Sequence, residues 1–481
     1  MAANPYLNRS NVLNTSNNPL KQSAHHNPAS KPPHVAVVGA GWAGLAAASE
    51  LHALGFRVTV YDASRTPGGR ARQVDDPAMG TLDNGQHLLS GAYRDTLALI
   101  ARDVPEAERT QSFTRQRLRL CSTDRQFVLN APRWLPSSLR SAASLWLAKG
   151  LSINDKRSAT QLMLRLKTSN GQEGDDQAVR QWLNNAQQSE RLIRLLWEPL
   201  CLATLNTAID EASSHLFQRV LCDSLLSPQA SAADLLIPAV DLSTLWPEHV
   251  CAKVNSRLGQ TVKTVAEVTG GVRVNDDVYD GCIIAVPPHG VQRLFEEAAH
   301  QQYPRIFSAL STFEYRPITT CYVDLETSLT LGEPFMMMRH DLNSETSPAP
   351  GQWVFDRNIC QPGSATSFGR LAFVVSDSTS VLSLSPDDLA DQLMKQLARE
   401  RSPSPTPVAI KASRCFHEKR ATFAAKPRLS RPNNETPWRQ ITFAGDWTDT
   451  GYPSVLEGAV KSGLRAANCL ARQMPKKSLA P

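Results

Sequence analysis

Three glycines near the start of the chain have a spacing that can bind phosphate groups. Gly39, Gly41 and Gly44 form a Gly-x-Gly-x-x-Gly pattern. A diphosphate at a helix N-terminus lies against bare backbone N–H groups, and a Cβ atom would hold it away. We expect Gly39 to make the turn, Gly41 to admit the diphosphate, and Gly44 to let a helix and a strand pack closely. The pattern, completed by Ala40, Trp42 and Ala43, predicts a dinucleotide site.

An acid and two arginines follow this pattern. Asp62 stands about 20 residues after Gly39, the distance at which a carboxylate accepts hydrogen bonds from ribose hydroxyls. The segment Arg65-Thr-Pro-Gly-Gly69-Arg70 supplies a second glycine turn and guanidinium groups that can pair with a diphosphate. A charged loop exposed to solvent is the alternative interpretation. FAD and NAD share the first pattern, so these glycines alone do not separate the two cofactors.

A strand, a helix and a second strand must position these residues. Residues 35–38 form an apolar, β-branched run that leads directly into the first glycine. Residues 45–51 have a helix-forming composition, and residues 57–62 resemble a second strand. The three segments together predict a βαβ unit of an α/β fold.

The spacing from Asp62 to Gly69 and Arg70 resembles that of the amine oxidase and phytoene desaturase superfamily of flavoproteins. In those proteins an acid at the end of the second strand is followed by a Gly-Gly-Arg turn. The acid here is Asp62 where Glu is usual, and Ser64 stands where an Arg is common, so we expect Arg65 to substitute. The resemblance implies FAD as the cofactor. It also implies a Rossmann-like FAD-binding domain assembled from discontinuous segments, with an α+β substrate-binding domain.

The second half of such a site is expected near the C-terminus. Residues 441–446 are typical of a strand that ends in Gly445 and Asp446, and a helix is expected after residue 451. A helix N-terminus favours the negative charge that reduced flavin carries near its pyrimidine edge. By the resemblance, Asp446 binds the ribityl or diphosphate portion. The resemblance also implies backbone contacts to the isoalloxazine ring from Pro453, Ser454 and Val455.

The resemblance places further residues around the flavin. Gly85 and Gln86 belong to a turn expected beside it, and Val262, in a segment of alternating strands, is expected against the adenine. His87 and Tyr452 are candidates for a general acid, although a single His or Tyr is more often a structural hydrogen-bonding group. No catalytic residue is assigned beyond these two candidates.

Other segments resemble one branch of the superfamily, the squalene-associated FAD-dependent hydroxysqualene dehydroxylases of hopanoid biosynthesis. They are residues 80–93, 196–206, 236–246 and 443–458. The branch implies reduction of the allylic alcohol hydroxysqualene to squalene, with hydride from reduced FAD. Such a reaction needs an apolar tunnel for a long-chain isoprenoid and exclusion of water.

Three segments are candidate walls of that tunnel: 134–149, 192–197 and 334–338. An ordinary hydrophobic core is the alternative for all three. Residues 134–149 carry Trp and Leu with Arg140 and Lys149, at a spacing that suits contact with a membrane surface or an ordinary amphipathic helix. The sequence has no uncharged apolar run of about 20 residues, the length that a membrane-spanning helix needs.

Three rival functions stay open. A carotenoid-type, phytoene-like desaturase shares the cofactor and the apolar tunnel but removes hydride from a polyene precursor. An amine oxidase is less favoured, because neither an aromatic pair nor a cysteine for flavin attachment can be identified. A prenyl-binding escort protein keeps the fold without redox chemistry. The sequence shows no second dinucleotide pattern, so we expect an external electron donor for FAD.

Composition sets few limits on partners. The sequence has 51 Lys and Arg residues and 45 Asp and Glu residues. The positive residues are scattered through the 481 residues, so no nucleic-acid partner is indicated. The nine cysteines form no C-x-x-C motif, so we expect no metal site and reduced thiols. These features are typical of a cytoplasmic protein, either free or peripheral on the inner membrane surface.

The expected domain organisation is discontinuous. We expect a disordered tail at 1–33 and a C-terminal tail at 474–481. The FAD-binding domain comprises 34–95, 240–295 and 408–473, and the substrate domain comprises 96–239 and 296–407.

Overall fold

The structure is a computed structural model, and it describes residues 31–131, 143–169, 171–229, 231–342, 344, 346–364, 368–401 and 408–474. The expectations for most of both tails, and for the first part of segment 134–149, therefore lie outside the described residues. In the ranges searched, no helix has the length and hydrophobicity to cross a membrane.

Among the described residues, five parallel strands form the first sheet, in the order β10-β2-β1-β14-β20. Their bounds are β10 (Asn255–Leu258), β2 (Arg57–Asp62), β1 (His34–Val38), β14 (Gly281–Ile284) and β20 (Ile441–Phe443). Residues Val35 to Val38 are buried, which explains the unbroken apolar run of β1. The beginning, the middle and the end of the chain all contribute strands to this sheet.

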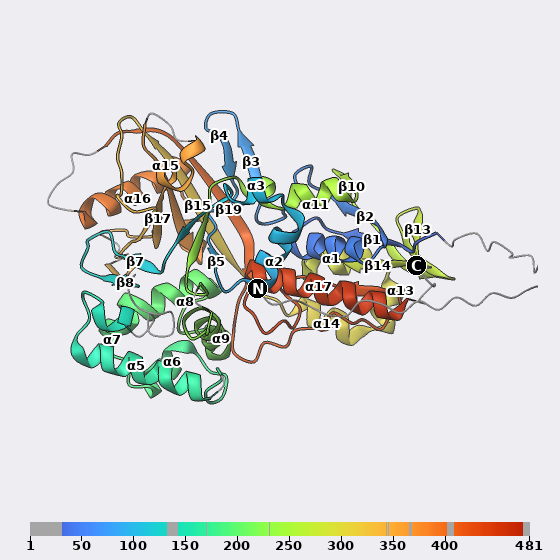
Figure 1. Ribbon diagram of the computed structural model, residues 1–481, viewed down its shortest axis with the longest axis horizontal. Helices are drawn as coiled ribbons and strands as arrows, with labels where there is room; N and C mark the ends of the chain where they lie inside the picture. Colours follow the sequence, from blue (N-terminus) through green and yellow to red (C-terminus); the bar gives the residue numbers. More distant parts are fainter. Residues whose placement is uncertain are drawn as a thin grey trace, which may run out of the picture.

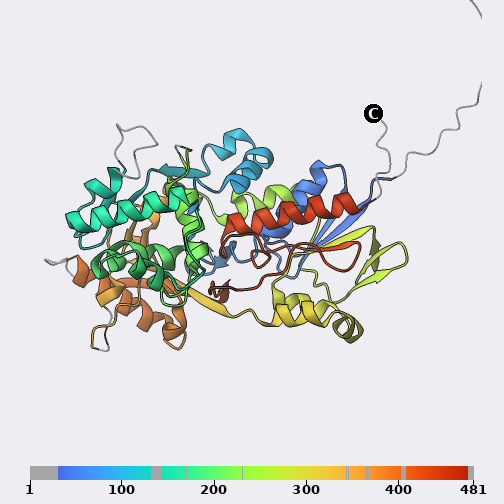
Figure 2. The ribbon, with the colours of Figure 1, turned by 90° about the horizontal axis from the view of Figure 1, so that it is seen from below.

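The helices α1 (Trp42–Ala53) and α17 (Leu456–Gln473) lie side by side on this sheet (Figures 1 and 2). They pack tightly at Gly463, where an added Cβ atom would lie 2.1 Å from the carbonyl oxygen of Ala43. The absence of a side chain at this position therefore allows α1 and α17 to pack this closely. The parallel sheet and its helices form the right half of Figure 1.

Five antiparallel strands of the described chain form a second sheet, in the order β16-β17-β18-β15-β19, in the left half of Figure 1. Their bounds are β16 (Phe335–Met337), β17 (Trp353–Asp356), β18 (Arg370–Ser376), β15 (Tyr315–Leu325) and β19 (Ile410–Phe423). One face packs against α16 (Pro386–Glu400) through an apolar cluster that includes Val323, Phe373 and Leu393. The other face borders the cavity described below. The parallel and antiparallel sheets with their helices confirm the predicted fold class.

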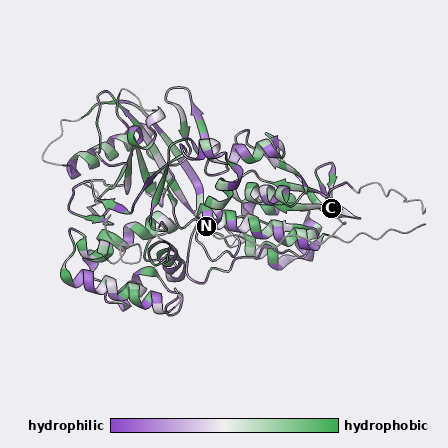
Figure 3. Cartoon of the chain, viewed as in Figure 1, coloured by the Kyte–Doolittle hydropathy of each residue, from purple (hydrophilic) through white to green (hydrophobic). Residues whose placement is uncertain are grey.

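A group of helices lies below the antiparallel sheet in Figure 1. They are α5 (Ile153–Thr168), α6 (Val179–Asn185), α7 (Glu190–Leu192), α8 (Glu198–Leu205) and α9 (Ser214–Leu225). The outer helices carry both hydrophilic and hydrophobic residues (Figure 3), as expected for helices with one buried face. Between α7 and α8, residues Ile193–Trp197 form a π-helical turn, and Pro199 just after it has no N–H to donate to an α-helical bond.

Shorter elements complete the fold. Those of the first half are β3 (Gln73–Asp76), β4 (Gly80–Asp83), β5 (Leu89–Ser90), α2 (Arg94–Asp103), α3 (Glu106–Arg109), β6 (Phe113–Gln116), β7 (Arg119–Cys121), β8 (Val128–Asn130) and β9 (Leu235–Pro238). Those of the second half are α10 (Leu242–Leu245), α11 (Pro247–Lys253), β11 (Val265–Val268), β12 (Gly271–Val274), β13 (Asp277–Tyr279), α12 (Pro288–Leu294), α13 (Glu297–Gln302), α14 (Pro304–Ser311) and α15 (Arg357–Cys360).

Candidate active site

A cavity of about 1370 Å³ runs from the carboxyl ends of the parallel strands to the open face of the antiparallel sheet. The predicted cofactor-binding residues all line it except Ala40, Gly44, Arg65 and Pro453. Both candidates for a general acid, His87 and Tyr452, also line it. The structure thus brings together residues that are separated by more than 400 positions in the sequence, such as Gly39 and Val455.

Two glycine turns meet at one end of this cavity. Gly41 and Gly68 form a parallel bridge, and the N–H of Gly68 donates to the carbonyl of Ala40 at 2.8 Å. An added Cβ atom on Gly69 would lie 2.9 Å from the Cα of Gly41. On Gly44, it would lie 1.9 Å from the carbonyl oxygen of Gly39. The turns leave bare backbone facing the cavity, which is what a bound diphosphate requires.

Asp62, the last residue of β2, is hydrogen-bonded to the first glycine turn. Its carboxylate accepts hydrogen bonds from the N–H groups of Ala40 at 2.6 Å and Ser64 at 2.7 Å. Val262 lies in the segment between β10 and β11, which also lines the cavity. Arg65 is exposed and lies against Gly259, outside the cavity lining.

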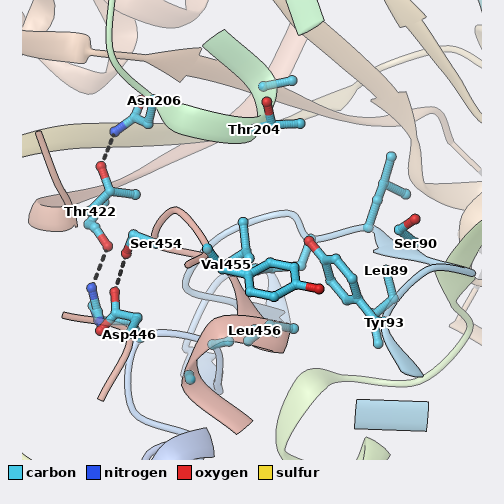
Figure 4. Close-up of a pocket in the computed structure, with 18 of the residues that line it drawn as sticks. Leu89, Ser90, Tyr93, Thr204, Asn206, Thr422, Asp446, Ser454, Val455 and Leu456 are labelled. Atoms are coloured by element: carbon cyan, nitrogen blue, oxygen red, sulfur yellow. Dashed lines mark hydrogen bonds and ion pairs between the residues drawn. The ribbon is translucent and has the colours of Figure 1, made fainter. Parts of the chain in front are cut away.

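An ion pair joins the N-terminal and C-terminal halves of the site. The Arg70 guanidinium lies 2.5 Å from Asp446 and also donates to the carbonyl of Ala421 at 2.7 Å. The Ser454 hydroxyl donates to the same carboxylate (Figure 4). Burial raises the pKa of Asp446, but the Arg70 charge and the hydrogen bonds from Arg70 and Ser454 outweigh it, so the net pKa lies below its ordinary value. Asp446 is therefore a buried carboxylate with its charge compensated.

The N-terminus of α17 also points toward the cavity. Val455 is its N-cap residue, and Ser454, Val455 and Leu456 line the cavity beside Leu89 and Tyr93 (Figure 4). The cap has no side-chain hydrogen bond, so backbone N–H groups of the first turn are left for a ligand. This geometry suits a ligand atom that carries negative charge.

A buried network fixes the turn that contains Gln86. Arg357, whose side chain is 6% exposed, donates to the side-chain oxygen of Gln86 at 2.7 Å and to that of Gln361 at 2.5 Å. Burial raises the pKa of Asp83, 3.9 Å from Arg357, to about 6. Arg357 was not found from the sequence, because it lies about 270 positions from Gln86. An Arg directly after an apolar strand end was the available signal.

Neither candidate acid is a free, readily ionised group. Nδ1 of His87 lies 2.8 Å from the carbonyl oxygen of Gly85, and burial lowers the pKa of His87, so the ring is neutral at pH 7. The Tyr452 hydroxyl donates to Asp223 and accepts from Arg219 at 3.1 Å. Burial and the bond to Asp223 raise the pKa of Tyr452 to about 12.

The other end of the cavity is mainly apolar. Of the predicted walls, the residues that line the cavity are Ser144, Leu145, Leu196, Trp197 and Phe335. Most of this wall was missed, because it is assembled from α5, α8, α9 and the antiparallel sheet, which are far apart in the sequence. The alternation in β15 was the available signal, but its partner strands are distant in the sequence.

Glycine turns on a parallel sheet, an ion pair joining two half-sites and an apolar chamber define an FAD-dependent oxidoreductase. The chain belongs to the family of flavin-containing amine oxidoreductases, whose sequence model matches residues 42–471. FAD is its cofactor.

Curated relatives cover nearly the whole chain. The chain is 28% identical over 470 residues to a hydroxysqualene dehydroxylase of Rhodopseudomonas palustris, covering 90% of this chain and 97% of the relative. It is 25% identical to a probable zeta-carotene desaturase of Synechococcus elongatus, covering 91% and 98%.

Solved structures share the fold. An oxidoreductase from Methanosarcina mazei matches with a TM-score of 0.66 at 16% identity, covering 90% of this chain and 99% of that one. Putrescine oxidase bound to putrescine matches with a TM-score of 0.65 at 18% identity, covering 92% and 99%.

Proposed function

We propose that this chain reduces hydroxysqualene, an allylic C30 alcohol, to squalene. The observation that carries the proposal is the continuity of the cavity, which joins the glycine turns to an apolar chamber. At about 1370 Å³ it exceeds the usual range for one small ligand, so a cofactor and a long apolar substrate can lie end to end. The similarity to hydroxysqualene dehydroxylases supports the choice of substrate.

We further propose that the predicted residues that line the cavity hold FAD in the roles expected from the sequence, whereas Arg65, outside the lining, does not. The backbone at Gly41 and Gly69 would meet the diphosphate, and Asp62 the ribose. Asp446 would meet the ribityl or diphosphate portion, and the N-terminus of α17 the isoalloxazine ring. The predicted division into an FAD-binding domain and a substrate domain belongs to the same proposal.

Bound reduced FAD supplies the hydride, and a separate reductant restores it. The residues of this chain do the remaining work. The apolar wall binds the isoprenoid and excludes water from the allylic carbon that loses its hydroxyl. The departing hydroxyl needs a proton to leave as water, and His87 and Tyr452 remain the candidates for supplying it.

We also propose that the cavity opens toward a membrane surface at α5. Leu164 lines the cavity and is 58% exposed, and Leu147 and Ile153 nearby are each 63% exposed. Lys167 also lines the cavity, and its positive charge suits contact with anionic lipid head groups. Leu147→Glu should reduce flotation with anionic vesicles, whereas Val278→Glu, at an exposed apolar residue on β13, should not. Equal flotation of both variants would contradict this contact.

The proposed reaction is tested with purified holoenzyme. The protein is photoreduced without oxygen and mixed with hydroxysqualene, and the extracted lipids are analysed by mass spectrometry. Squalene formation that requires both the protein and reduced FAD supports the proposal. Failure to form squalene, with dehydrogenation of a carotenoid precursor by the oxidised enzyme, would favour the desaturase. A purified protein that binds the isoprenoid but not flavin would favour the escort protein.

A further inference from the structure

One face of the antiparallel sheet is a wall of the cavity. Ile318, Phe335, Phe355 and Val374 supply its apolar surface. They alternate along their strands with residues that pack against α16 on the opposite face. Polar groups on this wall are therefore exceptions that need a reason.

Two polar atoms of the wall have no hydrogen-bond partner among the described residues: Oγ1 of Thr320 and Nε1 of Trp353. Thr320 is 1% exposed and Trp353 is 8% exposed. Both residues pair with Val374, so they lie in one row, with Thr320 on β15 and Trp353 on β17. Leaving a buried hydroxyl unpaired costs about 1–3 kcal/mol, so a partner from a ligand is the simplest explanation.

Thr320 lies at the flavin end of this row. An added Cβ atom on Gly85 would lie 3.8 Å from Oγ1 of Thr320 and 3.2 Å from the His87 ring. Gly85 and His87 belong to the loop that follows β4 and lines the cavity. Trp353 stands two strands away, about 10 Å between Cα atoms at ordinary strand spacing. An indole N–H can only donate, whereas a threonine hydroxyl can both donate and accept.

We propose that the Thr320 hydroxyl binds the hydroxyl group of the substrate alcohol. The inference rests on the proposed function and adds a specificity-determining residue to it. A purely apolar wall discriminates only weakly between an alcohol and the corresponding hydrocarbon. A site built to hydrogen-bond a hydroxyl binds a ligand without a hydroxyl more weakly. Thr320 therefore makes the alcohol bind more tightly than the squalene product, which favours product release.

Binding to the oxidised holoenzyme tests this assignment without turnover. Hydroxysqualene and squalene are titrated separately, and each Kd is read from the change in the flavin absorption spectrum. Thr320→Val keeps the shape of the side chain and removes the hydroxyl. Thr320→Val should weaken the binding of hydroxysqualene about fivefold to tenfold and leave the Kd of squalene unchanged. Thr320→Ser should keep the preference for the alcohol.

Thr319→Val is the matched control. The Thr319 hydroxyl lies on the opposite face of β15, bonded to Ser378 at 2.8 Å and close to His417 at 2.9 Å. This variant should lose stability but keep the ratio of the two Kd values.

Three results would overturn the assignment. The first is a wild-type protein that binds the alcohol and the hydrocarbon equally well, and the second is an equal loss of affinity for both ligands in Thr320→Val. The third is a Thr320→Val variant whose flavin spectrum or FAD affinity changes while its preference for the alcohol stays intact. The last result would make the cofactor the partner of Thr320. Squalene formation by the wild-type enzyme is scored separately, so failure of the proposed reaction is distinguishable from failure of this assignment.

Discussion

The ion pair between Arg70 and Asp446 should contribute measurably to the stability of the fold. Breaking a fully buried pair by removing one partner costs about 3–5 kcal/mol, because it leaves an uncompensated charge. The Asp446 side chain is 5% exposed but that of Arg70 is 35% exposed, so water screens part of the interaction. We therefore expect a coupling free energy of about 2 kcal/mol between the two side chains.

A double-mutant cycle isolates this coupling. Arg70→Met, Asp446→Asn and the double variant are prepared without FAD, and the free energy of unfolding is measured in urea. The pKa of Asp446 is lowered in the folded state, so its contribution is present above its unfolded pKa and is lost as pH falls through the folded value. The coupling should therefore hold from pH 5 to 8 and weaken only as pH falls below the ordinary pKa of an aspartate. A coupling below about 0.5 kcal/mol at pH 7 would refute the reasoning.

Three further outcomes are expected. Gly69→Ala, at φ +63° and with its Cβ atom 2.9 Å from Gly41, should lower FAD affinity about tenfold or more, measured as flavin bound per chain. Gly55→Ala is its control, with φ +85° and open space, and equal flavin loss in both would contradict the close approach of the turns. Gly463→Ala should lower the thermal unfolding temperature, since its Cβ atom would lie 2.1 Å from the α1 backbone, and an unchanged temperature would contradict that packing. The pKa of Asp83 is raised to about 6 in the folded state, so its protonated carboxyl group contributes to the free energy of unfolding. This contribution is fully present below the unfolded pKa near 4 and is lost as pH rises through 6. Asp83→Asn should abolish that part of the pH dependence of the unfolding temperature, and an identical dependence in both proteins would contradict the shift.

The parts of the molecule that could be predicted from the sequence are those set by local chemistry. The first strand, glycine turn and helix follow from residues 35–51, because a buried parallel strand must be apolar and a diphosphate loop must lack side chains. Gly445 and Asp446, at the end of a short buried strand, were expected from the resemblance to the flavoprotein superfamily and not from local chemistry alone.

The remaining parts depend on contacts between distant segments. Val262 was expected in a segment of alternating strands, but the strand begins only at Val265, as Val265–Val268, and it joins a separate small sheet. Thr320 gave no signal, because a threonine in a strand is ordinary until its neighbours are known. Its significance comes from Val374 and Trp353 on two other strands, which no local pattern connects to it.

The position of α17 against α1 constrains how the protein is made. Ribosomes add about 5–20 residues per second, so the first helix emerges on the order of tens of seconds before the last one exists. During that time the apolar surface of α1 lacks its final partner, and the edge of β14 lacks β20. Asp446 and the N-terminus of α17 come from this late segment, so the proposed FAD site can be completed only once these residues have been made.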